Sequence, residues 1–236
     1  VYTPEWFEGF SVSVDYWDIQ LEDAINAVSG QNIADGCYQN TSGLNPAFCD
    51  LLGRNSDSNS IFFGGFNFMK STSINFAKRE TSGYDFYLGY DFSIEAHEFA
   101  LSATGTYVDE LNDFSNPLDL TDVDPELGEI RRPELAGNVE LKWTWGDFRA
   151  GWQAQYVDEM LLGFLEIETA EALYGPSVFM DEMWVHDLNF SYNVDENLQL
   201  YGGVNNVTDE EPFITNYAYP VNAIGRYYFL GFNMKM

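Results

Sequence analysis

Basic side chains are scarce in this sequence. Its 236 residues hold 10 Lys and Arg against 38 Asp and Glu, a formal net charge of −28 at pH 7. A surface of this sign repels polyanions, which argues against a role in binding nucleic acid. The charge is typical of a solubilising or salt-adapted exterior. The alternative is that acidic loops bind cations or sugars.

Long hydrophobic runs are also missing. No stretch of about 18 apolar residues occurs, so the sequence predicts no transmembrane helix. Hydrophobic residues still make up 45% of the chain and aromatic residues 17%, although the mean hydropathy is −0.25. Large apolar side chains that alternate with polar ones give this combination, and alternation favours strands. Strands of membrane β-barrels have the same pattern.

Only two cysteines are present, Cys37 and Cys49, and they do not form a CxxC motif. Their close spacing favours a disulfide formed in an oxidising compartment, and the alternative is a pair of buried free thiols. The sequence starts at Val1 without a signal peptide, as expected of a mature chain or of part of a longer one.

A catalytic set is not recognisable. The two histidines, His97 and His186, fall in predicted strands without a nearby Ser or Cys nucleophile pattern. The sequence therefore predicts a protein that is not an enzyme and has no cofactor. The alternative is an acid–base site made of His186 and Asp187.

Period-two alternation is the organising signal of the chain. For example, Tyr84, Phe86, Leu88 and Tyr90 share one parity, while small and polar residues occupy most of the other. Eight strands are predicted, at residues 9–20, 73–92, 97–107, 133–145, 148–157, 183–194, 198–206 and 225–236.

The connections between these strands alternate in length. Short turns are predicted at 93–96, 146–147 and 195–197, and long connections at 22–72, 108–132, 158–182 and 207–224. Outer-membrane barrels have this asymmetry of short periplasmic turns and long extracellular loops. The sequence therefore predicts an all-β fold, a transmembrane antiparallel up-and-down β-barrel.

Two sets of loop residues are candidates for binding. Asp122, Asp124 and Glu126 alternate in an acidic segment and could offer oxygen ligands to Ca²⁺, although the EF-hand spacing is absent; the alternative is a solvated acidic loop. Loop aromatics are candidates for contact with a ligand, because aromatic faces stack on sugars and apolar molecules. They are Tyr38, Phe48, Phe164, Tyr174, Phe179, Phe213, Tyr217 and Tyr219. The alternative is that these rings pack the loops against one another.

The end of the chain forms an amphipathic strand. One parity is apolar through to the last residue, as expected of a terminal strand that barrel insertion machinery recognises. This parity holds Tyr228, Leu230, Phe232, Met234 and Met236.

Five stretches, in order, resemble the C-terminal part of TonB-dependent outer-membrane receptors. They are TPEWFEGFSVSVDYWDIQLEDAI (3–25), the cysteine-bearing CYQNTSGLNPAFCDLLGR (37–54), NFAKRETSGYDFYLGYDF (75–92), LQLYGGVNNVTDEEPF (198–213) and GRYYFLGFNMKM (225–236). The third contains a central Gly83, and the fourth an Asn-Asn-x-x-Asp turn at Asn205, Asn206 and Asp209. The closing residue of the family is usually aromatic, whereas this sequence has Met236.

The resemblance implies that residues 1–236 form the eight C-terminal strands of a 22-stranded barrel domain. The N-terminal plug and the earlier strands would lie outside this sequence. It also implies the outer membrane of a Gram-negative bacterium, contact with membrane lipid, and a TonB complex engaged through the absent N-terminal region. The implied function is active import of a scarce nutrient that binds at extracellular loops. The few loop cations favour a neutral ligand, such as an oligosaccharide, over an anionic ferric siderophore.

Two other functions fit the same strands. A stand-alone eight-stranded barrel would anchor or adhere, but its interior must be filled by side chains. The inner parity here is rich in small residues, namely Ser11, Ser13, Ala77, Gly83, Ala100, Ser102, Ala136 and Gly151, which favours the larger barrel. A soluble lipocalin-like binder would need the opposite parity, with an apolar interior and a polar exterior.

Overall fold

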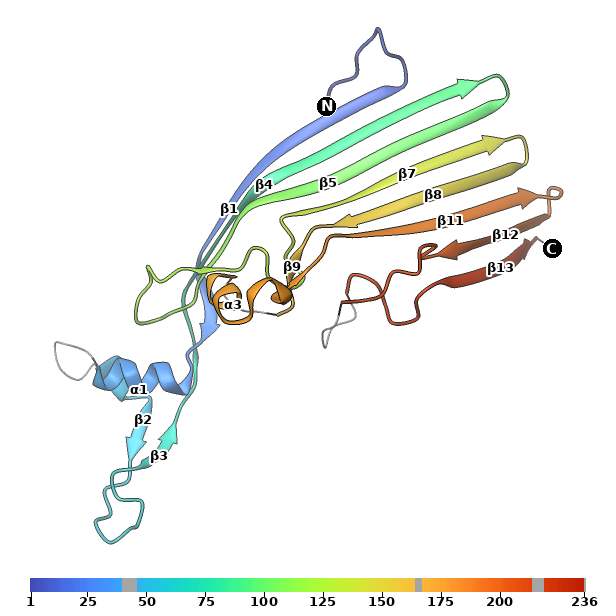
Figure 1. Cartoon of the computed structure of the whole chain (residues 1–236). Helices are drawn as coiled ribbons and strands as arrows, with labels where there is room; N and C mark the ends of the chain where they lie inside the picture. Colours follow the sequence, from blue (N-terminus) through green and yellow to red (C-terminus); the bar gives the residue numbers. More distant parts are fainter. Residues whose placement is uncertain (40–45, 164–166, 214–218, 236) are drawn as a thin grey trace. The chain divides into compact units, whose positions relative to one another are not determined.

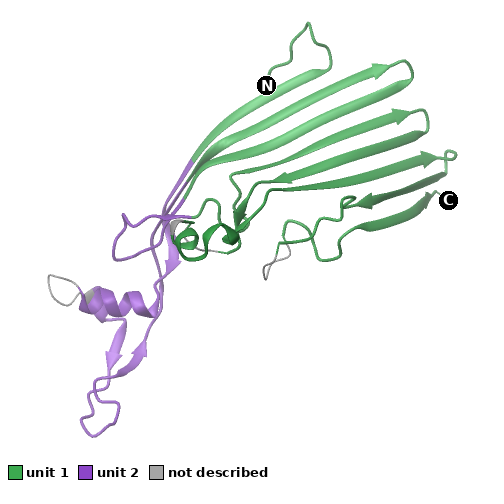
Figure 2. Cartoon of the chain, viewed as in Figure 1, with its two compact units in different colours: residues 1–18, 81–111, 126–236 green, residues 19–80, 112–125 purple. Residues whose placement is uncertain are grey.

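The structure is a computed structural model of the chain, and it describes all residues except 40–45, 164–166, 214–218 and 236. Two compact units make up the chain (Figure 2). Unit 1 comprises residues 1–18, 81–111 and 126–236, and unit 2 comprises residues 19–80 and 112–125.

Eight strands lie side by side in one antiparallel sheet, in the same order as in the sequence (Figure 1). They are β1 (Phe10–Ala27), β4 (Ser73–Ile94), β5 (His97–Phe114), β7 (Leu135–Trp145), β8 (Phe148–Val157), β11 (Met183–Asn193), β12 (Leu198–Asn205) and β13 (Tyr227–Met234). A ninth, β6 (Asp124–Pro125), pairs with β5. The predicted up-and-down meander is confirmed. The sheet is open, because β1 and β13 stand at opposite ends of the strand order.

The predicted strand bounds hold within about two residues for most strands, and β8 agrees at both ends. The exceptions are β1 and β5, which continue to Ala27 and Phe114, beyond the predicted ends at 20 and 107. Acidic residues such as Glu22, Asp23 and Asp109 interrupt the apolar parity there. A strand whose two faces are both polar loses the alternation by which it is recognised, so these segments were wrongly predicted as loops.

The register separates an apolar face of the sheet from a polar face. Residues directly opposite each other on adjacent strands point to the same side. One such row is Leu101, Leu141, Trp152 and Leu188. The neighbouring row, on the other side, is Ser102, Glu140, Gln153 and Asp187. Large side chains of the apolar face are exposed in this chain, with Leu188, Phe190 and Tyr192 between 44% and 47%.

Aromatic rings line the apolar face beside the short turns. The ring centroids of Phe92 lie 4.9 Å from those of both Tyr90 and Phe99. Farther along the same edge, Trp143 lies 5.7 Å from His97 and 5.4 Å from Phe148. A belt of aromatic rings at the strand ends is the composition of an interfacial girdle.

The long connections of unit 1 carry structure that the sequence did not indicate. β9 (Met160–Leu161) pairs with β10 (Phe179–Met180), and α3 (Ile167–Tyr174) and a 3₁₀ turn, η1 (Gly175–Val178), lie between them. Figure 1 shows these elements at the end of the strands opposite the short turns. Two small apolar cores hold the connections together: Ile130, Val157, Met160 and Met180 in one, and Leu161, Ala170 and Val178 in the other.

Unit 2 contains a small fold inside the connection between β1 and β4. Its elements are α1 (Gly30–Tyr38), α2 (Pro46–Cys49), β2 (Leu52–Arg54) and β3 (Phe66–Met69). The Ser29 side chain caps α1 by accepting a hydrogen bond from the Asn32 amide. The core is formed by Val28, Ile33, Cys37 and Leu52. In the described part of the chain, no helix is long and apolar enough to cross a membrane.

Candidate ligand-binding site

A hollow of about 310 Å³ lies at the ends of β11, β12 and β13 that face away from the short turns. Asp187 and Asn205 contribute polar groups from the strands, and Tyr227 contributes a ring and a hydroxyl. Asn222 and Ile224 line it from the segment that precedes β13. Carboxylate, amide and aromatic groups together suit a polar, uncharged ligand, because they offer donors, acceptors and a stacking face.

The Asn-Asn-x-x-Asp turn builds this hollow. Asn206 is buried, and its amide exchanges two hydrogen bonds of 2.8 Å with the backbone of Glu210. The Asn206 backbone amide donates to Asp187 Oδ1 at 2.7 Å. Asp209 Oδ1 accepts from the Arg226 amide at 2.8 Å. The turn thereby ties the end of β12 to β11 and to the start of β13.

Both turn residues have left-handed backbone conformations, with φ of 52° at Asn206 and 64° at Asp209. Asn and Asp tolerate this region better than other residues with a side chain. This requirement is the physical reason for these residue types at the turn. The motif is visible in the sequence, but its place beside a hollow depends on the fold.

Arg132 anchors the nearby connection between β5 and β7. Its guanidinium forms an ion pair with Glu126 at 2.9 Å and a second with Glu129. The two carboxylate side chains are only 11% and 7% exposed. The backbone of this segment reaches β9, because Leu161 donates to the Gly128 carbonyl at 2.8 Å. The sequence predicts no such cluster; its one signal is an Arg three residues after a Glu.

The candidate calcium ligands fall partly within this cluster. Glu126 is paired with Arg132, Asp122 accepts a hydrogen bond from Asn116, and Asp124 belongs to β6. Across the described ranges, no group of three or more His, Cys, Asp or Glu side chains is arranged to hold a metal ion.

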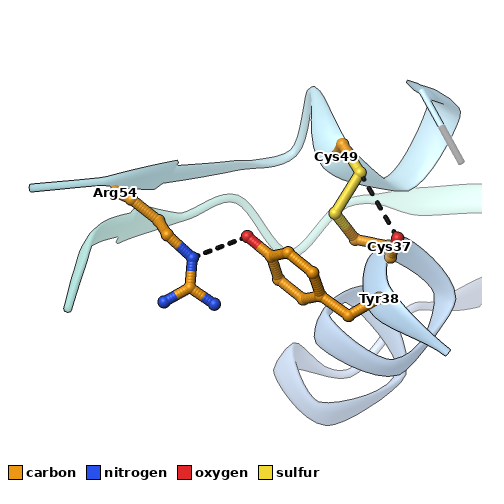
Figure 3. Close-up of a disulfide and its surroundings, with 4 residues drawn as sticks. All are labelled: Cys37, Tyr38, Cys49 and Arg54. Carbon is orange, nitrogen blue, oxygen red and sulfur yellow. Dashed lines mark hydrogen bonds between the residues drawn. A yellow bond between two sulfur atoms is a disulfide. The ribbon is translucent and has the colours of Figure 1, made fainter. Parts of the chain in front are cut away.

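The predicted disulfide between Cys37 and Cys49 is present. It joins α1 to α2 beside Tyr38, one of the aromatic ligand candidates (Figure 3). The Tyr38 hydroxyl accepts a hydrogen bond from Arg54 Nε at 2.6 Å. Phe48, a second candidate, packs against the core of unit 2.

Three further aromatic candidates pack within the connections of unit 1. Phe179 lies against one apolar core, and Phe213 and Tyr219 lie against the other, with their rings 6.4 Å apart. Burial raises the pKa of the Tyr219 phenol above its ordinary value. Tyr174 is 60% exposed. Phe164 and Tyr217 lie outside the described residues.

Both histidines contact tryptophan rings. His97 Nδ1 accepts a hydrogen bond from the Trp143 indole at 3.1 Å. The His186 ring stacks beside Trp152 on the apolar face. Asp187 is the next residue of β11 and so points to the opposite face, which rules out an acid–base pair of His186 and Asp187.

The terminal strand has the predicted parity. Its outward residues Tyr228, Leu230, Phe232 and Met234 are each at least 60% exposed. Leu230 and Phe232 stand opposite Gly202 and Leu200 of β12. Met236 lies outside the described residues.

Comparison with known proteins identifies the family. Residues 2–207 match the family described as TonB dependent receptor-like, beta-barrel. The chain therefore belongs to the TonB-dependent receptor β-barrel family. No match was found among curated proteins.

Solved structures share the fold at low sequence identity. A variant of the ferric enterobactin receptor PfeA from Pseudomonas aeruginosa aligns with a TM-score of 0.61 at 14% identity, over 97% of this chain and 29% of that one. The siderophore receptor PirA from Acinetobacter baumannii aligns at 0.59 and 14%, over 97% and 30%. The copper transporter OprC aligns at 0.54 and 13%, over 97% and 29%. The chain thus spans less than a third of the length of these proteins.

Proposed function

We propose that this chain forms part of the wall of an outer-membrane transporter of a Gram-negative bacterium, which imports a small nutrient with energy from a TonB complex. The observation that carries the proposal is the sheet itself, in which every second residue contributes to an exposed apolar face and the others to a polar face. Lipid would cover the first face and the transport lumen would adjoin the second. Family membership supports the same role.

The strand order favours a larger barrel over the anchoring alternative. A closed eight-stranded barrel requires its first and last strands to pair, yet β1 and β13 are not neighbours in the sheet. Peptide mapping of the native protein tests this directly. A native polypeptide that starts at Val1 and has a mass of only 26.9 kDa would contradict the larger barrel.

For the ligand, we propose a neutral, hydroxyl-rich molecule of the oligosaccharide class. The hollow at Asp187 supports this class, since carboxylates and amides hydrogen-bond hydroxyl groups and the ring of Tyr227 offers a stacking face. Anionic ligands would call for Arg or Lys, and neither type is among the described residues that line the hollow. The proposed ligand class differs from that of PfeA, which is described as a ferric enterobactin receptor.

Uptake by the full-length protein tests transport and ligand class separately. Cells would be given a radiolabelled maltooligosaccharide or a ferric catecholate, with and without TonB depletion. We expect TonB-dependent uptake of the sugar. Asp187→Asn should raise KM about tenfold. The substitution removes the negative charge that strengthens a hydrogen bond from a ligand hydroxyl to this side chain, a contribution of about 1.5 kcal/mol. Ser191→Ala, nearer the short turn on the same face of β11, is the control.

Two results would overturn different parts of the proposal. Uptake of the ferric catecholate but not of the sugar would refute the ligand class and leave transport standing. Uptake of neither substrate would likewise refute the ligand class, whereas uptake that persists without TonB would refute TonB-dependent import.

A further inference from the structure

Three consecutive apolar side chains project from the turn between β2 and β3 in unit 2. Ile61 is 92% exposed, Phe62 71% and Phe63 63%. Single exposed apolar residues are ordinary on protein surfaces, but large ones gathered at one point mark an interaction site. These three residues are called the apolar tip below.

Backbone hydrogen bonds hold the apolar tip in a defined conformation. The Asn55 amide donates to the Gly65 carbonyl, and the Gly64 amide donates to the Asn55 carbonyl, both at 2.8 Å. Within the turn, Phe63 donates to the Ser60 carbonyl at 3.0 Å. Gly64 has a φ of +79°, a conformation that glycine adopts without strain. The three side chains are therefore presented by an ordered turn.

Arg54 fixes the base of this hairpin. Its guanidinium lies between the rings of Tyr38 and Phe66, 4.6 Å and 4.5 Å from their centroids. Its Nε donates to the Tyr38 hydroxyl, and Nη1 donates to the Gly64 carbonyl. Because Tyr38 follows Cys37, this contact ties the turn to the disulfide-linked helices (Figure 3). A surface ordered in advance loses less entropy on binding.

Shape and charge restrict what could cover the apolar tip. Small molecules bind in concave sites that enclose them, whereas these side chains project into solvent. Segments that dock on membranes combine apolar residues with Lys and Arg. Unit 2 has the opposite balance: Glu22, Asp23, Asp35, Asp50, Asp57, Glu80, Asp113, Asp119, Asp122 and Asp124 against Arg54, Lys70, Lys78 and Arg79. A second copy of the chain would bring a further net charge of −28.

We propose that the apolar tip docks into another protein, in an apolar pocket whose rim carries Lys or Arg. The rim would complement the acidic surface of unit 2, and the rings of Phe62 and Phe63 would fill the pocket. Three side chains cover less than the roughly 800 Å² per partner of a stable interface, so the association is reversible and centred on these residues.

Photo-crosslinking in native outer membranes tests the proposal with the full-length protein. A benzophenone amino acid replaces Phe62 in one variant and Leu120 in another, since Leu120 is an exposed apolar residue of unit 2 outside the tip. We expect one discrete adduct with a different protein from position 62 and none from position 120. The adduct protein, once identified and purified, should bind the receptor more weakly as salt is raised, because charge complementarity is screened.

Variants then establish whether the tip itself makes the contact. Ile61→Ser and Phe62→Ser should each raise Kd at least about tenfold, as truncation of central interface residues does. Leu120→Ser should leave it unchanged. These substitutions spare the fold, because the tip is held by backbone atoms and by Arg54.

Four outcomes would overturn the proposal. They are an adduct with lipid alone, an adduct with a second copy of the receptor, no adduct above that of position 120, and a partner whose Kd is insensitive to salt or to Phe62→Ser.

Discussion

Replacing Arg132 by Met should loosen the connection between β5 and β7. Arg132 pairs with Glu126 and Glu129, whose carboxylates are largely buried. Replacing Arg132 removes a cation from beside two like charges that have little access to water. Loss of one partner of a buried ion pair costs about 3–5 kcal/mol. Since the Arg132 side chain is itself 28% exposed, water can replace part of its contact, and we expect about 3 kcal/mol.

Hydrogen exchange at two amides gives the assay. Leu161 donates to the Gly128 carbonyl, and Gly128 donates to the Arg132 carbonyl, each at 2.8 Å. These hydrogen bonds open when the segment unfolds locally. A loss of about 3 kcal/mol corresponds to exchange faster by about two orders of magnitude. Amides of β8 far from the segment, such as Ala150, should exchange as before.

A compensated variant separates charge from packing. Combining Arg132→Met with Glu126→Gln and Glu129→Gln also removes the two carboxylate charges, so most of the lost protection should return. The reasoning would be refuted if Arg132→Met alone left exchange at Leu161 unchanged, or if the triple variant exchanged as fast as the single one.

Two other predictions concern the disulfide and the wall. Replacing both Cys37 and Cys49 by Ser removes a covalent link between positions 12 residues apart. Through loop entropy this should lower the free energy of unfolding of unit 2 by about 3 kcal/mol and accelerate proteolysis between β1 and β4. An unchanged rate of cleavage would show that the disulfide is dispensable. Gly203→Ala should impair barrel assembly, since its methyl group would lie 2.4 Å from a backbone carbonyl oxygen and 2.7 Å from the Phe229 ring. Gly163→Ala is the control, because there is open space around Gly163. The yield of folded protein is measured by gel mobility before and after heating, and equal yields from the two variants would contradict the predicted clash.

The sequence by itself determined the strands that carry strict alternation. In β8, alternate residues belong to the apolar and the polar face of the sheet, so the sequence of residues 148–157 predicts both the strand and its two ends. The disulfide was expected from the proximity of Cys37 and Cys49. The turn at Asn205, Asn206 and Asp209 was recognised through the resemblance to TonB-dependent receptors, and the left-handed backbone at Asn206 and Asp209 explains these residue types.

Tertiary structure decided where the connections fold and which side chains meet. The short strands β9 and β10 owe their place to a core shared by distant residues, such as Ile130 with Met160 and Met180, and no local period in the sequence indicates them. The same holds for Arg132 and its two carboxylates and for the position of Arg54 between two rings. Phe48, Phe179 and Phe213 are indistinguishable from Phe62 in the sequence, yet they pack against apolar cores while Phe62 faces solvent. Burial of a loop aromatic depends on what the fold brings beside it, and a linear pattern does not contain that information.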